Sequence, residues 1–294
     1  MYLIAVFILV LKNIKYFCAT FPEMKIRIII YLVSALLLVS CSQYSKLLKS
    51  TDYELKKTKV KEYFENGDFS KVTQLLEQIL PRYRATEEAE ELTWMSAQSY
   101  YGQKDYLMAG AEFRNYANIY PYGKHDEESN FLAAMCDYYM SPRAELDQQN
   151  SRNAIDGFTV FISKYPSSQR TEDAKKYIKE LKDRLSEKSY LSARLYYDMN
   201  QYKAAVTALA NSLKEYPETK YREEMLFLKL NSLFLYAENS IALKQTERFQ
   251  ATLDEYYSFI EEFPKTTYKK DVNKIYQTTA KILKLNTEIT QTNN

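Results

Sequence analysis

The chain has 294 residues and is nearly charge-balanced, with 40 basic and 38 acidic side chains and a formal net charge of +2. This balance does not favour nucleic acid or an acidic membrane surface as a binding partner. The chain holds only five glycines but 28 tyrosines. So few glycines argue against phosphate-binding glycine loops, because such loops need backbone conformations that only glycine adopts cheaply.

The first informative element is a leader-like segment over residues 24–40. It reads "MKIRIIIYLVSALLLVS", with two basic residues, Lys25 and Arg27, before a short apolar stretch. That order is typical of a secretory signal peptide, and the stretch is shorter than the roughly 20 residues of a membrane-spanning helix. The closing "LVSC", which ends at Cys41, resembles a bacterial lipobox, in which the cysteine becomes the lipidated first residue. An uncleaved N-terminal anchor helix is the alternative.

Residues 1–23 form another apolar segment, but both of its lysines follow the apolar run instead of preceding it. We therefore expect translation to begin at Met24 and residues 1–23 to be a misannotated extension. Residues 41–51 are then the lipidated cysteine and a tether, and we expect no cofactor other than the covalent lipid on Cys41. Several acyl chains on one cysteine would anchor a protein stably, whereas a single chain is marginal.

An aromatic residue followed by proline closes four helically spaced apolar runs. These pairs are Tyr120–Pro121, Tyr165–Pro166, Tyr216–Pro217 and Phe263–Pro264, and Tyr83 closes a fifth run without the proline. Each pair precedes a polar, acid-containing stretch such as "TEDAKK" or "REEM". Proline ends one helix and acidic residues favour the start of the next, so these segments predict boundaries between helices.

Further landmarks recur inside each unit. Phe69, Tyr106 and Tyr202 each follow a break between two amphipathic runs, and small residues recur at matching positions of both runs. Small residues at a helix crossing let two helices approach closely. A third shared position holds tyrosines that we assign to packing: Tyr63, Tyr100 and Tyr196. The chain is therefore predicted to be all-α, with helix-turn-helix repeats that resemble tetratricopeptide (TPR) units stacked in a right-handed superhelix.

About five repeats and a closing helix can be placed in an array over 52–285. We expect the repeats near 53–84, 86–121, 125–166, 171–217 and 221–264, the closing helix at 268–285 and a flexible tail at 286–294. The third repeat has an expanded loop over 141–153, where Pro142 prevents a continuous helix. The fourth has an elongated first helix, with apolar residues at helical spacing from Ala174 to Leu185.

Residues 164–224 carry a more specific likeness. They contain a "YP" helix end, a long charged helix with "LKDRL", an alanine–tyrosine helix core and a "YPET" close. This pattern resembles the BamD family, the TPR lipoproteins of the outer-membrane β-barrel assembly machinery (the Bam complex). The number of repeats, the loop in the third unit, the length and the lipobox agree with it.

The resemblance implies a non-enzymatic scaffold, lipid-anchored in the outer membrane and facing the periplasm. Members of the family bind the POTRA domains of the barrel protein BamA through C-terminal repeats and receive unfolded outer-membrane protein substrates on N-terminal repeats. Ser42 after the cysteine, and the lack of an acidic cluster in "SQYSKLLKS", favour a periplasm-facing anchor. The alternative is a periplasmic TPR adaptor lipoprotein for envelope division or peptidoglycan machinery.

A peptide-binding groove follows from repeat geometry, because the first helix of each TPR unit lines the concave surface of the array. Counting from the shared landmarks, we expect six residues of the first two units to point there: Lys57, Lys61, Phe64, Trp94, Gln98 and Tyr101. Aromatic walls with a few lysines would suit the terminal aromatic residue and carboxylate of a barrel substrate. Packing between helices is the alternative role for the aromatic residues.

Catalytic chemistry is sparse in this sequence. His125 is its only histidine, and Cys136 is the only cysteine after Cys41. A zinc cluster, a Ser-His-Asp triad or a Cys-His pair would need more of these residues than the chain has, or would all have to use His125. We therefore expect no metal site and no enzymatic activity.

Overall fold

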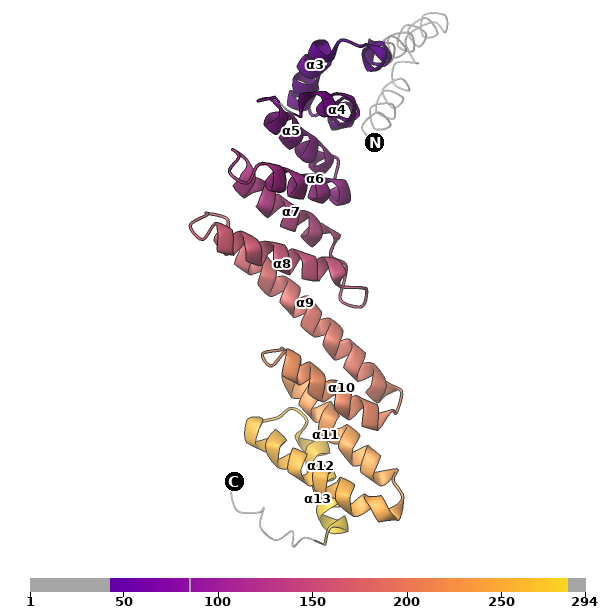
Figure 1. Cartoon of the computed structure of the whole chain (residues 1–294). Coiled ribbons are helices and arrows are strands. Elements are labelled where there is room, and N and C mark those ends of the chain that lie inside the picture. The colour runs from indigo at the N-terminus through magenta and orange to yellow at the C-terminus, as the bar shows by residue number, and fades with distance from the viewer. Residues whose placement is uncertain (1–42, 85, 285–294) are drawn as a thin grey trace, which may run out of the picture. The chain divides into compact units, whose positions relative to one another are not determined.

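The computed structural model describes residues 43–84 and 86–284, and this part of the chain is helical throughout, without a strand (Figure 1). The expected extension over 1–23, the expected signal peptide over 24–40, Cys41 and the expected tail over 286–294 lie outside the described residues. The chain separates into two compact units, Met1–Gln103 and Lys104–Asn294.

The first unit contains a short helix over 43–49 followed by three longer ones. These are α3 (Tyr53–Glu65), α4 (Phe69–Tyr83) and α5 (Ala89–Gly102), and each packs against the next. Their shared core includes Val60 of α3, Leu76 of α4 and Leu92 of α5, all 1% exposed or less. Leu47 of the short helix is buried in the same cluster. Residues 43–49 are therefore part of the packed unit, which corrects the expectation of a tether over 41–51, because Leu47 is buried against α3 and α4.

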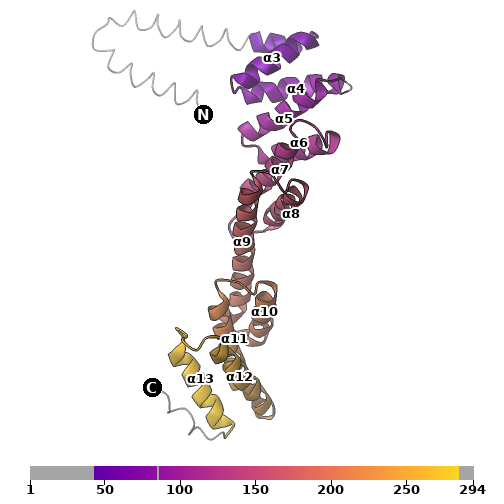
Figure 2. The same cartoon turned by 90° about the vertical axis from the view of Figure 1, so that its left-hand side faces the viewer.

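The second unit is a run of helices that pack in chain order (Figure 2). They are α6 (Tyr106–Ile119), α7 (Asp126–Met140), α8 (Gln149–Lys164), α9 (Thr171–Asp198), α10 (Tyr202–Glu215), α11 (Arg222–Glu238), α12 (Ala242–Glu262) and α13 (Lys269–Ile282). α11 also contacts α9 and α13, as the first helices of successive hairpins do in a TPR array. The predicted all-α fold of TPR-type helix hairpins is confirmed.

The aromatic–proline segments end helices as predicted. Tyr120, Tyr165, Tyr216 and Phe263 are all C-caps, with φ between −122° and −127° and ψ between 62° and 70°. The backbone N–H of each donates to the carbonyl four residues earlier, at 2.8 to 2.9 Å. The proline that follows has no N–H to donate, so it cannot continue the ladder.

The aromatic residues that follow the break between two runs also occupy one defined structural position. Phe69, Tyr106 and Tyr202 are the first residues of α4, α6 and α10. Two positions earlier the backbone is left-handed at Gly67, Lys104 and Asn200, with φ of 75°, 62° and 59°. Glycine and asparagine are the residues that most readily take this conformation after a helix, and it turns the chain into the next helix.

Equivalent ring stacks join successive hairpins of the second unit. Tyr190 of α9 stacks on Tyr221, just before α11, with ring centroids 4.3 Å apart. Phe227 of α11 stacks in the same way on Tyr268, just before α13, at 4.1 Å. Stacks of this kind contribute on the order of 1 kcal/mol beyond the burial of their area.

The structure contains both predicted irregular features, the loop of the third repeat and the elongated first helix of the fourth. The loop between α7 and α8 covers only 141–148, shorter than expected, because the Asp147 carboxylate accepts the Gln149 N–H and α8 begins there. Arg184 of α9 donates to the carbonyls of Ser141 and Pro142 and so holds the loop. α9 is 28 residues long, against 14 for α10, and it continues beyond the level at which α8 lies beside it (Figures 1 and 2).

Candidate functional site

Lys57, the first residue of the predicted groove, is engaged within the first unit. Its Nζ lies 2.7 Å from Glu54 Oε2 and 2.8 Å from Glu88 Oε1, and 5.0 Å from the centre of the Tyr83 ring. Hydrogen bonds to Glu54 and Glu88 raise the pKa of the Lys57 ammonium above its ordinary value. Its charge is therefore balanced internally, and the residue ties α3 to the start of α5.

The other predicted groove residues differ in accessibility. Lys61 is exposed, and Phe64, one turn further along α3, is half-buried, with its ring centroid 5.9 Å from that of Phe69 in an edge-to-face arrangement. Gln98 and Tyr101, one turn apart on α5, are half-buried. Trp94 is only 7% exposed and so leaves little surface for a ligand. Counting from landmarks misplaces this residue because α5 is buried on nearly every face from its first turn to Ser99.

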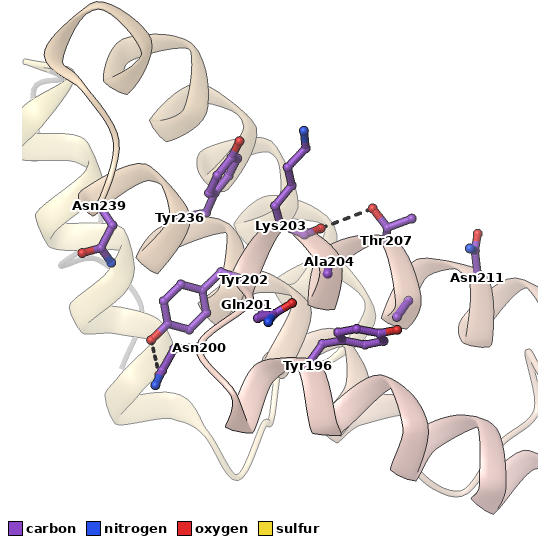
Figure 3. A pocket seen from close by; sticks show the side chains of 11 residues that line it. Tyr196, Asn200, Gln201, Tyr202, Lys203, Ala204, Thr207, Asn211, Tyr236 and Asn239 are labelled. Atoms are coloured by element: carbon purple, nitrogen blue, oxygen red, sulfur yellow. Dashed lines mark hydrogen bonds between the residues drawn. The ribbon is translucent and has the colours of Figure 1, made fainter.

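Another surface feature lies in the second unit, where the sequence predicted no site. It is an open hollow of about 1030 Å³ between the end of α9, the first half of α10 and the end of α11 (Figure 3). We call it the α9–α10 hollow. Its lining includes Tyr196, Ala204, Thr207, Asn211 and Tyr236, together with Lys203 at its side.

Tyr196 corrects a prediction, because it was assigned to packing and is 42% exposed at the α9–α10 hollow. Tyr236 faces the hollow from α11, with the Arg248 guanidinium 3.9 Å from its ring centre. Tyr202 donates its hydroxyl to Asn200 Oδ1 at 2.7 Å (Figure 3). The lining therefore combines aromatic rings with neutral amide and hydroxyl groups and includes one lysine and no carboxylate.

His125 and Cys136, the residues considered for catalysis, both lie at positions where they contribute to the packing of α7. His125 precedes α7, and its backbone N–H donates to the Tyr116 hydroxyl at 3.1 Å. Cys136 is fully buried in α7, and burial raises the pKa of its thiol to about 12, so it stays protonated near neutral pH. Within residues 43–84 and 86–284, no three His, Cys, Asp or Glu side chains gather as metal ligands would. None of the described helices combines the length and apolarity needed to cross a bilayer.

Comparison with known proteins assigns the family. Residues 51–248 match the model of YfiO, which is described as an outer membrane lipoprotein. The chain belongs to the YfiO family. The match runs from just before α3 into α12, so both the predicted groove and the α9–α10 hollow lie within the YfiO region.

Two curated relatives agree with the YfiO assignment and confirm the resemblance to BamD. One is the outer membrane protein assembly factor BamD of Haemophilus influenzae, 22% identical over 214 residues, which cover 69% of this chain and 82% of the relative. The other is the factor of the same name from Vibrio cholerae, 22% identical over 222 residues, which cover 71% and 91%. A solved structure, the TPR domain of P58(IPK), is 12% identical, with a TM-score of 0.38, and covers 82% of this chain and 68% of that one.

Proposed function

We propose that the protein is a scaffold for β-barrel assembly at the outer membrane and has no catalytic role. It is lipid-anchored through Cys41, faces the periplasm and binds the POTRA domains of a BamA-like barrel protein. The match to the YfiO family over residues 51–248 is the observation that carries this proposal. The relatives named as outer membrane protein assembly factors support it, because the alignments cover most of their length.

The first unit is the proposed receiving site for unfolded barrel substrates. The proposed site consists of Lys61 and Phe64 on α3 and of Gln98 and Tyr101 on α5, all of them exposed or half-buried. Lys61 would attract the terminal carboxylate of a substrate, and the half-buried aromatic residues would contact its terminal ring. Lys57 and Trp94 are not part of this proposal, because the first is paired with two carboxylates and the second is buried.

The partner assignment is tested by purification from membranes. The chain is tagged at its C-terminus and recovered in mild detergent, and co-purifying proteins are identified by mass spectrometry. We expect a large barrel protein with POTRA domains to dominate. Recovery of septal or peptidoglycan proteins in its place would support the adaptor alternative and contradict the assembly role.

The receiving site is tested with a labelled peptide that ends in an aromatic residue and a free carboxylate. Lys61→Glu should weaken binding severalfold, because the substitution replaces an attractive charge with a repulsive one, and salt should weaken binding to the unchanged protein. Lys270→Glu, an exposed position on α13, is the matched control. Equal affinity of both variants in fluorescence anisotropy would contradict the placement of the site.

A further inference from the structure

The two units contain the same three-helix arrangement at a constant spacing in the sequence. Residues of α3, α4 and the start of α5 recur 133 positions later in the second half of α9, in α10 and in the start of α11. The pairs include Tyr63 with Tyr196, Phe69 with Tyr202, Leu76 with Leu209 and Tyr83 with Tyr216. Because the spacing has no gap, each position of the first arrangement has one counterpart in the second.

The backbones of the two arrangements turn in the same way. The N–H of Asp68 donates to the Tyr63 carbonyl at 2.8 Å, and that of Gln201 donates to the Tyr196 carbonyl at 2.9 Å. Gly67 and Asn200, in between, are both left-handed. In both turns the N–H donor lies five residues after the carbonyl, and a left-handed residue directly precedes the donor, so the two helices end in the same way. The surfaces that surround Tyr63 and Tyr196 are therefore counterparts in structure as well as in sequence.

In the first unit the chain covers this surface with its own helix over 43–49. The Tyr44 ring meets the Tyr63 ring edge-on, with centroids 5.8 Å apart. The Tyr44 hydroxyl lies 3.1 Å from both the Lys71 carbonyl and Gln74 Oε1. Lys56 Nζ donates to the Leu48 carbonyl at 3.1 Å and to Gln78 Oε1. The covering helix thus presents an aromatic residue, followed three and four residues later by Leu47 and Leu48.

In the second unit the counterpart surface is the α9–α10 hollow. The counterparts of Tyr63, Lys71, Gln74 and Gln78 are Tyr196, Ala204, Thr207 and Asn211, and all four line the hollow (Figure 3). Three of these side chains are smaller than those in the first unit, which widens the hollow. The arrangement that receives a helix in the first unit is therefore present and open in the second.

The length of α9 explains why this surface is open. The first half of α9 packs in a cluster with α7 and α8, through Ala174 and Leu181. The second half packs in a different cluster with α10 and α11, through Tyr190 and Ala193. α8 therefore shares a buried cluster with the first half of α9, whereas Tyr196, near the end of α9, remains exposed.

We infer that the α9–α10 hollow is a docking site for a short amphipathic helix of a partner protein. The helix carries an aromatic residue for Tyr196 and apolar residues three and four positions later, in the manner of Tyr44, Leu47 and Leu48. Such spacing places the anchors on one helix face. Lys203 favours an acidic or neutral helix over a basic one. The inference does not rest on the role in barrel assembly.

A second copy of the chain is a poor source of this helix. Leu47, its best-buried residue, is 9% exposed, and Tyr44 is bonded to α4 within the same unit. Release of the segment would expose this core and break those bonds. A separate partner helix faces no such competing contact, so the occupant is assigned to another protein.

The test uses the segment as the probe, with its two lysines made neutral. An acetylated and amidated peptide of residues 42–50 that carries Lys46→Gln and Lys49→Gln has no net charge. It is added to the full chain in detergent, with the methyl groups of alanine and threonine labelled for NMR. The signals of Ala204, Thr207 and Ala208 should shift together and saturate. A peptide with Tyr44→Ala should bind at least about tenfold more weakly, because truncation of a central aromatic anchor has that effect.

Two variants locate the site. Ala204→Arg and Thr207→Arg each fill the hollow and should weaken binding at least about tenfold. Ala251→Arg, at an exposed position of α12, is the matched control and should leave binding unchanged. Circular dichroism establishes that each variant is folded, and since Thr207 is exposed, the test holds even if Ala204→Arg is unstable.

Three results would overturn the inference. The first is the absence of any shift at the hollow. The second is a shift confined to methyl signals of the first unit, which would mean that the peptide only replaces the chain's own helix there. The third is dimerisation of the full chain that is lost in Thr207→Arg, since it would assign the hollow to a second copy.

Discussion

Asp137 on α7 is a buried carboxylate with one charged partner. Its side chain is 8% exposed, and its Oδ2 lies 3.1 Å from Nη1 of Arg114, whose side chain is half-exposed. Burial raises the pKa of Asp137 above its ordinary value, against the opposing effect of the arginine. A buried charge with a partner that is itself largely solvated gains little net stability from the pair.

The first prediction concerns Asp137→Asn, which keeps the shape of the side chain and removes its charge. Because the folded-state pKa lies above the unfolded one, protonation favours the folded protein, so this group contributes more stability as the pH falls through its folded pKa. The free energy of unfolding of the variant should therefore exceed that of the unchanged protein by up to about 1 kcal/mol at pH 7. This difference should disappear near pH 4, the ordinary pKa of the carboxyl group.

Urea unfolding at the two pH values measures the difference. Asp156→Asn, at an exposed position of α8, is the control and should show little change at either pH. A variant markedly less stable than the unchanged protein at pH 7 would show that the bond to Arg114 outweighs the cost of burial.

At the scale of the element, the turns between first and second helices share one left-handed position that three different residues occupy. Gly67 takes it without steric cost, and a Cβ built there meets no atom within 4 Å. Lys104 takes it with a side chain whose Cβ crowds the backbone in this conformation. The geometry of the turn is thus imposed by the two helices that it joins, whichever residue is present.

The second prediction follows from this comparison. Lys104→Gly should stabilise the second unit by about 0.5 to 1 kcal/mol, because relief of the left-handed strain exceeds the extra freedom of glycine in the unfolded chain. Gly67→Ala should destabilise the first unit by about 1 kcal/mol for the opposite reason. Thermal unfolding measures both effects, and a loss of stability in Lys104→Gly would mean that the lysine side chain makes a compensating contact.

At the scale of the whole molecule, each of the two units has buried clusters of its own. The cluster of the first unit includes Leu47, Val60 and Leu76, and those of the second lie between successive helices from α7 onward. In repeat proteins, stability is approximately the sum of the stabilities of the repeats and of the interfaces between neighbours. A substitution is therefore expected to change the stability of the helices near it and not of distant ones.

The third prediction uses this property. Tyr44→Ala removes the ring that faces Tyr63 and the hydroxyl that bonds to α4, so backbone amides of α3 and α4 should exchange with solvent faster. The amides of α10 to α13 should be unaffected. Hydrogen exchange read by mass spectrometry compares the two sets within one sample, and equal acceleration in both would contradict local control of stability.

The family match and the helix ends agree with what the sequence alone predicts, because the signals that end helices are local. A proline after an aromatic residue, or a turn residue two positions before Phe69 or Tyr202, acts on its own few neighbours and is read directly from the letters. The repeat pattern follows from the recurrence of these signals, and the all-α fold follows from the pattern.

The sequence by itself determined most helix ends from α3 onward, that the helices pair as repeats, and which family they belong to. It did not predict the helix over 43–49 or the start of α8 at Gln149. Tertiary structure decided which aromatic residues reach solvent. Tyr63 and Tyr196 occupy the same repeat position, yet a seven-residue helix meets the first and none of the described helices covers the second. The spacing of residues along one helix fixes the direction of a side chain, whereas its exposure depends on which distant segment comes to lie over it.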